Sequence, residues 1–194
     1  FPTRRSSDLR PPPPAPRPES AEPPAGPAGR APAFESPQDF VERLLPLARR
    51  AAARLGVPAE GIVAQAALET GWGQHVMHRP DGRPTWNLFG IKAGGDWSGD
   101  SVAARSVEVR DGEVVAETSR FRAYDSPEAA VADYARLLGG ERYSGVLASG
   151  DDVGAFGREL QRAGYATDPD YGRKIERVVE HVRERAPVPE RTDA

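Results

Sequence analysis

The sequence predicts an α+β fold in which α-helices predominate and one small β-hairpin is inserted. Two observations lead to this prediction. Apolar residues recur with a helical period in five segments between residues 36 and 183, and one short segment among them alternates with a period of two around an Asp-Gly pair. No internal repeat is visible, and 194 residues allow one domain of ordinary size with a tail.

The first two predicted helices precede the hairpin. Ser36-Pro37 is typical of a helix start, with Ser as the N-cap and Pro in the first turn, and Gly56 is expected to end this helix. Pro46 inside the helix predicts a kink. Pro58 begins a second helix, which is apolar along most of its length and ends with Glu69.

The hairpin is predicted by Asp111-Gly112, which joins the alternating segments 106–110 and 113–117. A two-residue loop fixes the register of the strands, and in that register Glu108 and Glu117 lie on the same face. The segments that flank the hairpin are polar and contain Gly, so we expect the hairpin to be loosely held.

Three further helices are predicted after the hairpin. Ser126-Pro127 repeats the cap-and-proline start. Asp151-Asp152 begins the next helix, which ends at Gly164, and Asp168-Pro169 begins the last one. Tyr171 is part of the apolar stripe of that last helix, which predicts a place in the core.

The two ends of the chain differ from the rest in composition. Eleven of the 20 prolines fall in residues 1–34, which predicts a disordered, Pro-rich linker, followed by a folded domain over 35–186 and a disordered tail over 187–194. Phe1–Leu9 contain no apolar core of a signal peptide. Because the chain begins with Phe, we expect a fragment or a processed product. The sequence contains no run of 18 apolar residues, so no membrane span is predicted.

The composition of the chain argues against several classes of partner and of catalytic site. The formal net charge is −3 and Lys and Arg do not cluster, which argues against nucleic acid as a partner. The chain has no cysteine, which excludes disulfides and thiolate metal sites. His75, His78 and His181 lack a metal-ligand spacing with nearby acids, and no Ser has a matching His and Asp, so we expect no metal, no cofactor and no nucleophilic triad.

Glu69 is the candidate catalytic acid. It follows Ile62 by seven residues and Gln65 by four, which places it on the helix face that is expected to be buried. It also lies in the last helical turn, where the macrodipole disfavours an anion. Both effects favour a protonated carboxyl near neutral pH, as a general acid requires. The alternative is a structural glutamate whose carboxylate is satisfied by backbone N–H groups or by an Arg.

A second carboxylate on the hairpin and many aromatic residues point to a sugar substrate. Glycoside hydrolysis needs two carboxyl groups on either side of a groove, and aromatic rings offer flat apolar faces to sugars. The candidate rings belong to Trp72, Trp86, Phe89, Trp97, Tyr124, Tyr143 and Tyr165. A place in the core is the open alternative for these rings, and it is the favoured one for Phe89, Tyr134 and Phe156.

Four blocks of sequence, taken in order, resemble a known family. The blocks are Ala67–Gly73, Asn87–Lys92, Phe121–Ser126 and Ala163–Pro169. Together they are similar to the N-acetylglucosaminidases of glycoside hydrolase family 73, and within that family to the C-terminal domain of its flagellar rod-assembly members. The resemblance covers about residues 38–183.

The resemblance implies a fold, an activity and a set of site residues. The fold is a lysozyme-like helical lobe with a small β-hairpin lobe, and the activity is hydrolysis of the β-1,4 bond between N-acetylglucosamine and N-acetylmuramic acid in peptidoglycan. Glu69 matches the general acid, Glu108 the hairpin carboxylate and Tyr165 a tyrosine of the active site. The substrate-binding residues carried over with them are Trp72, Asn87, Phe89, Tyr124 and Asp133. A structural helix acid remains the alternative for Asp133, and Glu117 remains the alternative to Glu108.

Three functions stay open at this point. The leading hypothesis is a peptidoglycan hydrolase that opens the cell wall for flagellar rod assembly. The alternatives are a lytic transglycosylase, which needs one acid, and a non-catalytic peptidoglycan-binding or rod scaffold module. We expect a monomer in the periplasm or cell envelope of a bacterium, with peptidoglycan as its partner and flagellar rod proteins reached through a domain absent from this chain.

Overall fold

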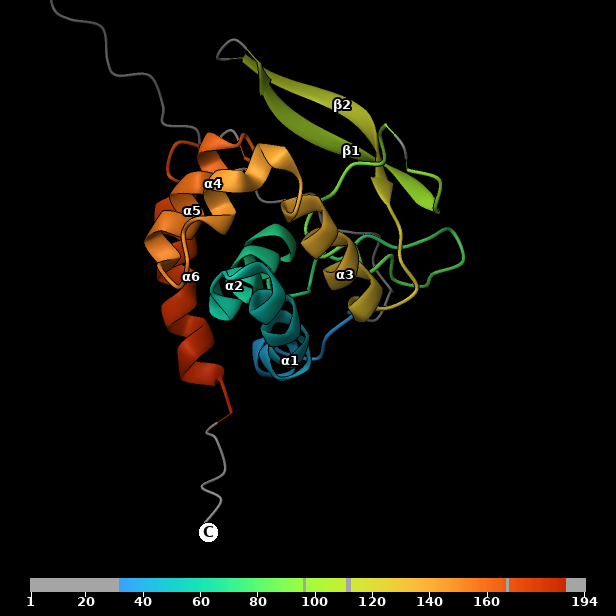
Figure 1. Cartoon of the computed structure of the whole chain (residues 1–194). Helices are drawn as coiled ribbons and strands as arrows, with labels where there is room; N and C mark the ends of the chain where they lie inside the picture. Colours follow the sequence, from blue (N-terminus) through green and yellow to red (C-terminus); the bar gives the residue numbers. More distant parts are fainter. Residues whose placement is uncertain (1–31, 96, 111–112, 167, 188–194) are drawn as a thin grey trace, which may run out of the picture.

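Two antiparallel strands extend from a group of packed helices (Figure 1). The computed structural model describes residues 32–187 except 96, 111–112 and 167, and the side chains of residues 106–115 also lie outside the description. The order of elements is α1 Pro37–Leu55, α2 Ala59–Thr70, β1 Ser101–Arg110, β2 Glu113–Arg122, α3 Pro127–Leu138, η1 Glu141–Tyr143, α4 Ser144–Leu147, α5 Val153–Arg162 and α6 Tyr171–Arg185. The α+β class with predominant α-helix is confirmed.

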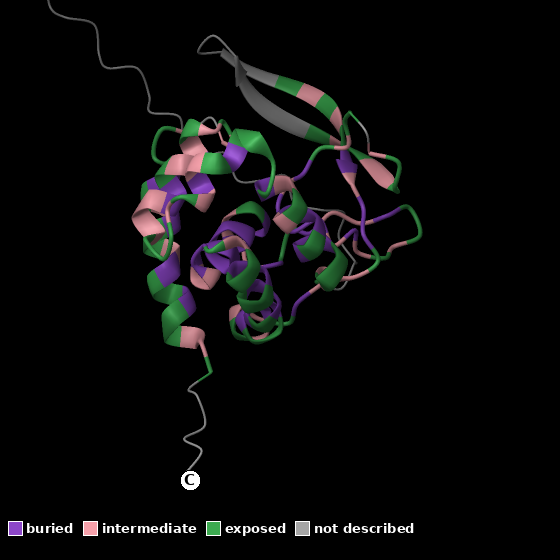
Figure 2. Cartoon of the chain, in the orientation of Figure 1, coloured by how far each residue is buried: buried purple, intermediate pink, exposed green. Residues whose placement is uncertain are grey.

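Helix α2 lies at the centre of the helical lobe. It packs against α1, α5 and α6, and residues 61–67 are buried on every side (Figure 2). A Cβ on Gly61 would come 2.9 Å from the Phe156 ring, so glycine is needed for α5 to pack this closely on α2. A helix buried all round needs an apolar sequence, and the segment from Gly61 to Leu68 provides it with the single exception of Gln65.

The helix ends follow the predicted signals. The Ser36 hydroxyl accepts a hydrogen bond from the Asp39 N–H at 3.1 Å, and Ser126 caps α3 in the same way. Gly56 ends α1 in the left-handed conformation at φ 70°, and α1 continues through Pro46. The short elements η1 and α4 were not predicted, because a helix of one turn is too short to show a period.

The start of the domain lies earlier than the sequence suggested. Phe34, which we assigned to the Pro-rich linker, is 1% exposed and packs edge-on against Phe40 and Trp86. The Arg43 guanidinium lies 4.7 Å from the centre of its ring. The boundary at 34/35 is therefore wrong by at least this residue. The composition of residues 1–34 is dominated by proline, and a single buried Phe does not change that composition.

The hairpin has the predicted register, and its strands are twice as long as predicted. Glu108 pairs with Val115 and Ser106 with Glu117. The base of β2 is held by backbone hydrogen bonds to a loop segment, from the Ala93 N–H to the Arg120 carbonyl at 2.8 Å and from the Arg122 N–H to the Ile91 carbonyl at 3.0 Å. The expectation of a loosely held hairpin is therefore wrong at its base. The segment that pairs with β2, residues 91–93, shows no strand periodicity in the sequence, so this pairing could not be predicted.

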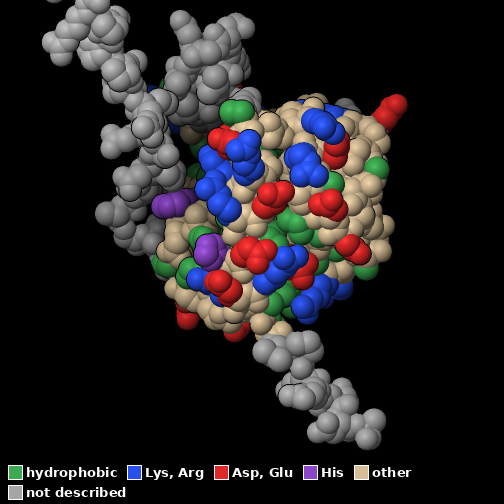
Figure 3. All heavy atoms as spheres, turned by 90° about the vertical axis from the view of Figure 1, so that its left-hand side faces the viewer, with side chains coloured by type: hydrophobic (Ala, Val, Ile, Leu, Met, Phe, Trp, Pro, Cys, Tyr) green, Lys and Arg blue, Asp and Glu red, His purple; other side chains and the backbone are tan. Residues whose placement is uncertain are grey.

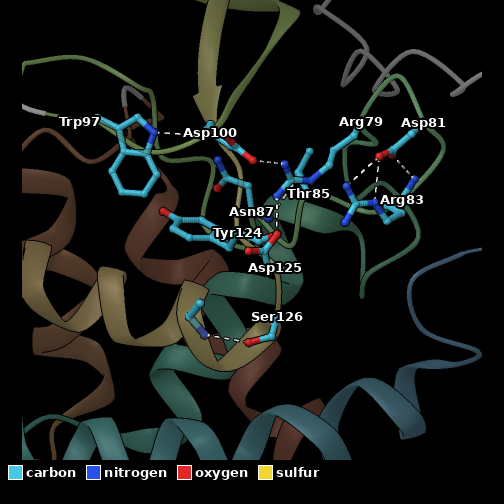
Figure 4. Close-up of polar contacts among 11 residues, drawn as sticks. Arg79, Asp81, Arg83, Thr85, Asn87, Trp97, Asp100, Tyr124, Asp125 and Ser126 are labelled. Carbon is cyan, nitrogen blue, oxygen red and sulfur yellow. Dashed lines mark hydrogen bonds and ion pairs between the residues drawn. The ribbon is translucent and has the colours of Figure 1, made fainter.

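A buried arginine fixes the long loop between α2 and β1 (Figure 4). Arg79 donates to the Asp100 carboxylate, to the Asp125 carboxylate at 3.0 Å and to the Tyr124 carbonyl at 3.1 Å. One guanidinium thus joins the loop, the start of β1 and the approach to α3. At the tip of the same loop, Arg83 pairs with Asp81.

Among the described helices, none is both long enough and apolar enough to cross a membrane.

Candidate active site

A groove of about 710 Å³ runs along the end of α2, between the base of the hairpin and the start of α6. Its walls come from five regions of the chain that are distant in sequence. The lining residues are Leu68, Glu69, Gly90, Ile91, Lys92, Phe121, Arg122, Leu137, Arg142, Tyr143, Gly164, Tyr165, Ala166, Asp168, Tyr171 and Lys174. Glu69 is the predicted catalytic acid, and it lies in this groove.

The residues after Glu69 determine where α2 stops. The Thr70 hydroxyl donates to the Ala66 carbonyl at 2.6 Å and accepts from the Gly73 N–H at 2.9 Å. Gly71, Trp72 and Gly73 all have positive φ, and a side chain on Gly73 would collide with Phe34. This turn ends the helix abruptly, so that Glu69 is left in its last turn beside the groove.

The Glu69 side chain is exposed to the groove, although its spacing placed it on a helix face that was expected to be buried. One carboxyl oxygen, Oε1, accepts a hydrogen bond from the Tyr171 hydroxyl at 2.9 Å. The other, Oε2, faces Gly90, where an added Cβ would lie 3.1 Å away. Gly90 has φ 63°, so both its backbone conformation and the space beside Oε2 favour glycine.

The surroundings of Glu69 favour its protonated form. Desolvation by the groove walls raises the pKa of the Glu69 carboxyl above its usual value, and the hydrogen bond from Tyr171 opposes part of that shift. The other titratable groups close to the carboxyl are the hydroxyls of Tyr134 and Tyr165, whose own pKa values burial raises well above normal. No Arg or Lys among the described residues forms an ion pair with Glu69, so the alternative of a structural glutamate satisfied by an Arg is not what the structure shows.

Tyr165 lies in the groove, but its hydroxyl is directed elsewhere. The hydroxyl donates to the Phe89 carbonyl at 2.6 Å, and the ring stacks on Tyr171 with centroids 6.5 Å apart. Tyr165 therefore forms a wall of the groove and supports Tyr171. Its catalytic role stays a prediction, carried by position rather than by contact with Glu69.

Asn87 and Phe89 are interior residues that shape the wall of the groove. The Asn87 amide donates to the carbonyls of Ile91 and Arg122, and its oxygen accepts from the Ile91 N–H at 3.0 Å. Phe89 is 1% exposed and stacks on Tyr134 at 4.0 Å. Neither side chain lines the groove, so the structure gives both a supporting place instead of the predicted contact with substrate.

Tyr124 and Asp133 also lie behind the groove. The Tyr124 hydroxyl donates to Asp133 Oδ2 at 2.6 Å, and Arg122 pairs with the same oxygen at 2.7 Å. Asp133 is 2% exposed, which leaves no face for a sugar. The alternative reading of Asp133 as a structural acid fits this geometry, since it anchors the Arg122 side chain at the groove edge.

Trp72 lies outside the groove as well. Its ring packs edge-on against Phe40 at 6.1 Å and lies beside Arg185. The sequence block that contains Glu69 thus has two separate roles, with the acid on the groove side and the indole on the core side.

Glu108 is located by its backbone alone. It lies in β1 opposite Val115, and its side chain is among those outside the description. Phe121 and Arg122 at the base of β2 line the groove, so the hairpin rises from the groove edge. The predicted role of Glu108 as the second carboxylate stays a prediction.

Tyr171 and Arg142 are among the groove residues that reasoning from the sequence did not assign to the site. Tyr171 was assigned to an apolar stripe, and its period does predict burial, but only the packing of α6 on α2 shows that its hydroxyl meets Glu69. A Cβ on Gly157 would lie 2.9 Å from Gly172 Cα, so these two glycines allow the close crossing of α5 and α6 next to Tyr171.

Arg142 had no sequence signal, because it lies in the unpredicted η1. Among the described residues, no cluster of His, Asp or Glu could hold a metal ion.

Comparison with known proteins shows close relatives with the same architecture. The chain is 45% identical over 151 residues to peptidoglycan hydrolase FlgJ of Pseudomonas aeruginosa, covering 77% of this chain and 38% of that protein. It is 41% identical over 155 residues to FlgJ of Salmonella typhimurium, covering 79% and 48%. The chain therefore spans less than half the length of these curated relatives.

A solved structure confirms the predicted lysozyme-like fold. The crystal structure of a peptidoglycan hydrolase mutant from Sphingomonas sp. A1 matches with a TM-score of 0.72 at 51% identity, over 76% of this chain and 97% of that one. The family model described as mannosyl-glycoprotein endo-beta-N-acetylglucosaminidase matches residues 45–184, which include Glu69 and the walls of the groove. The chain therefore belongs to the glucosaminidase family of glycoside hydrolases.

Proposed function

We propose that this domain hydrolyses the β-1,4 bond between N-acetylglucosamine and N-acetylmuramic acid in peptidoglycan, with Glu69 as the general acid. The observation that carries the proposal is the state of the Glu69 carboxyl. It lies in an open groove with a raised pKa, while Asp168, the other acid among the lining residues, is paired with Lys174. The names of the relatives supply the substrate class.

The chemistry follows from the two oxygens of Glu69. Tyr171 holds Oε1, so the proton is delivered from Oε2, which faces Gly90 and the groove. Protonation of the glycosidic oxygen lets the bond to the sugar break, and positive charge develops on the ring that is left. Water then adds to that ring and yields a new reducing end.

The second carboxylate is assigned to Glu108. A carboxylate on the hairpin can activate the water or stabilise the positive sugar. The support is the position of the hairpin at the groove edge and the resemblance of the sequence blocks. The acetamido group of the substrate is a further source of such stabilisation, and Glu117 remains the alternative residue.

Lytic transglycosylation is the second candidate. Of the two carboxylates that line the described part of the groove, only Glu69 is not in an ion pair, and a transglycosylase needs only one acid. The products distinguish the two reactions. Digestion of purified peptidoglycan followed by mass spectrometry should find reducing N-acetylglucosamine ends; 1,6-anhydro ends would establish the transglycosylase, and intact strands would favour a binding or scaffold module.

The cellular role is proposed at a coarser level. A hydrolase of peptidoglycan acts in the cell envelope, and similarity to proteins named FlgJ supports a role in opening the wall for the flagellar rod. We also propose that the domain acts as a monomer in the periplasm. Deletion in the source bacterium, followed by a motility assay with an E69Q complement, tests whether cleavage itself serves the flagellum.

A further inference from the structure

Among the described residues, the groove carries four basic side chains, and three of them are paired with carboxylates. Each of these three cations forms an ion pair at the groove wall, so that little of its charge is available to a ligand. The pairs are Lys92 with Glu117 at 3.0 Å, Arg122 with Asp133 at 2.7 Å, and Lys174 with Asp168.

Arg142 is the fourth cation, and it is held differently. Its Nε donates to the Ala163 carbonyl at 2.6 Å and its Nη2 to the Gly164 carbonyl at 2.8 Å. The guanidinium carbon lies 5.5 Å from the centre of the Tyr143 ring. Within the part of the chain that the structure describes, no carboxylate forms an ion pair with Arg142.

Four other arginines on α5 and α6 do have such partners. On the face formed by α5 and α6, Lys and Arg are interspersed with Asp and Glu (Figure 3). The ion pairs on that face are Arg158 with Glu176, Arg162 with Glu159, Arg173 with Asp170, and Arg183 with Glu180. Arg177 on the same face forms no ion pair either, but it lies outside the groove, so Arg142 is the groove cation without a carboxylate partner among the described residues.

The bonds of Arg142 fix its position without neutralising its charge. A guanidinium has five N–H donors, and two of them are used. The carbonyls at the end of α5 carry the negative end of the helix dipole, equivalent to about half an elementary charge. A fixed guanidinium with free donors suits a carboxylate, since the two groups can form paired hydrogen bonds.

We propose that Arg142 forms an anion subsite that binds a carboxylate of the peptidoglycan strand. The inference rests on the proposed function, because the strand is the source of the carboxylate. Two sources share this chemistry: the lactyl ether of N-acetylmuramic acid where its peptide has been removed, and the carboxylates of the peptide stem. The subsite lies beside Gly164 and Tyr165, and it makes the enzyme prefer charged strands to neutral ones.

The test compares Arg142→Gln with the wild-type protein on two forms of one substrate. The first is native peptidoglycan, and the second is the same material with its carboxylates converted to neutral amides by carbodiimide and ammonia. We expect the variant to lose about three- to tenfold in kcat/KM on native strands, mainly through KM, and to match the wild type on amidated strands. Arg142→Lys keeps the charge and should still favour native strands.

Arg162→Gln is the matched control, because Arg162 is exposed on α5, pairs with Glu159 and does not line the groove. It should behave as the wild type on both substrates. An amidase removes the peptide stems and exposes the lactyl carboxylate, so stripped strands separate the two sources. A deficit of Arg142→Gln on stripped strands assigns the lactyl group, and a deficit found on native strands alone assigns the peptide stem.

Two outcomes would overturn the subsite. An equal loss on native and amidated strands would show that Arg142 only supports Tyr165. The absence of any loss on both native and amidase-stripped strands would show that Arg142 binds no carboxylate of the strand. Sedimentation of each variant with insoluble native or amidated sacculi measures binding without cleavage. If the wild type cleaves neither substrate, the proposed function fails, while the sedimentation result still decides the subsite.

Discussion

Glu69 and Tyr171 are the residue pair on which the proposed chemistry depends. The acid ends α2 and the tyrosine begins α6, and they meet through one hydrogen bond of 2.9 Å. Desolvation raises the pKa of Glu69, whereas the hydrogen bond from Tyr171 lowers it. These opposed effects determine the pH range in which the carboxyl keeps its proton.

Glu69→Gln should abolish cleavage and should not destabilise the fold. The folded-state pKa of Glu69 lies above its usual 4.5, so its contribution to stability is fully present below that pH and is lost as the pH rises through the folded-state pKa. Glutamine does not ionise, so the variant should match the wild type in acid and melt at an equal or higher temperature at neutral pH. Thermal melts from pH 4 to 8, beside product analysis, measure both; wild-type turnover would rule out Glu69 as the acid.

Tyr171→Phe should change the pH profile as well as the rate. Removing the donor raises the pKa of Glu69 further, so the alkaline limb of kcat/KM moves to higher pH while activity at the optimum falls about tenfold. Tyr165→Phe is the comparison, because its hydroxyl bonds the Phe89 carbonyl and its loss should leave that limb in place. An unmoved limb in Tyr171→Phe would contradict the role of Tyr171 as a positioning residue.

At the scale of elements, three local structural features hold the groove in place: a turn, a buried arginine and a short backbone pairing. The turn after Glu69 ends α2 through Thr70, Gly71 and Gly73. The Arg79 side chain holds the following loop to the start of β1 and the approach to α3. Backbone pairing of residues 91–93 with β2 then fixes the base of the hairpin, while its distal part projects away from the helices (Figure 1).

The hairpin carboxylates provide the prediction at this scale. Glu108→Gln should reduce kcat strongly, though less than Glu69→Gln, because the acetamido group of the substrate can replace part of its effect. Glu117→Gln should have the smaller effect, since Glu117 pairs with Lys92 at the groove wall. Steady-state kinetics on peptidoglycan fragments compare the two. An inactive Glu117→Gln beside a fully active Glu108→Gln would reverse the assignment.

At the scale of the whole molecule, distant segments of the chain complete one core and one groove. Phe34 packs on Phe40 and Trp86 and fills the space beside Gly73, so it reinforces the turn that follows Glu69. The first described residues are thereby connected to the active site through packing.

Phe34→Ala should lower the free energy of unfolding by about 3–4 kcal/mol, because it removes a fully buried aromatic ring. Deletion of residues 1–30 should change neither the melting temperature nor turnover, since their composition offers almost no apolar surface to bury. Urea unfolding of both variants tests the contrast. A truncated protein as unstable as Phe34→Ala would show that the linker contributes to the fold.

Sequence reasoning predicted the five longer helices and the hairpin register, and it singled out Glu69 as the candidate acid, an assignment that stays a prediction. Caps such as Ser36 and Ser126, the Asp-Gly turn and the helical period of the apolar residues act over a few neighbouring positions, and a local signal can be read without knowing the fold. The block around Glu69 also combines an acid with glycines. Gly71 and Gly73 end α2 abruptly, and this end leaves Glu69 beside the groove.

The side chains that reach the groove could be identified only once the helices were packed together. Tyr171 meets the groove through the packing of α6 on α2, and Arg142 through the bonds that hold it to the end of α5. Asn87, Phe89, Tyr124 and Asp133 turn inward, although the family resemblance implied that they bind substrate. The physical reason is that burial and pairing depend on contacts between residues far apart in the sequence, such as Glu69 and Tyr171, which are 102 positions apart. A period shows that a side chain is buried, but the atom that its polar end meets is determined only when the helices pack.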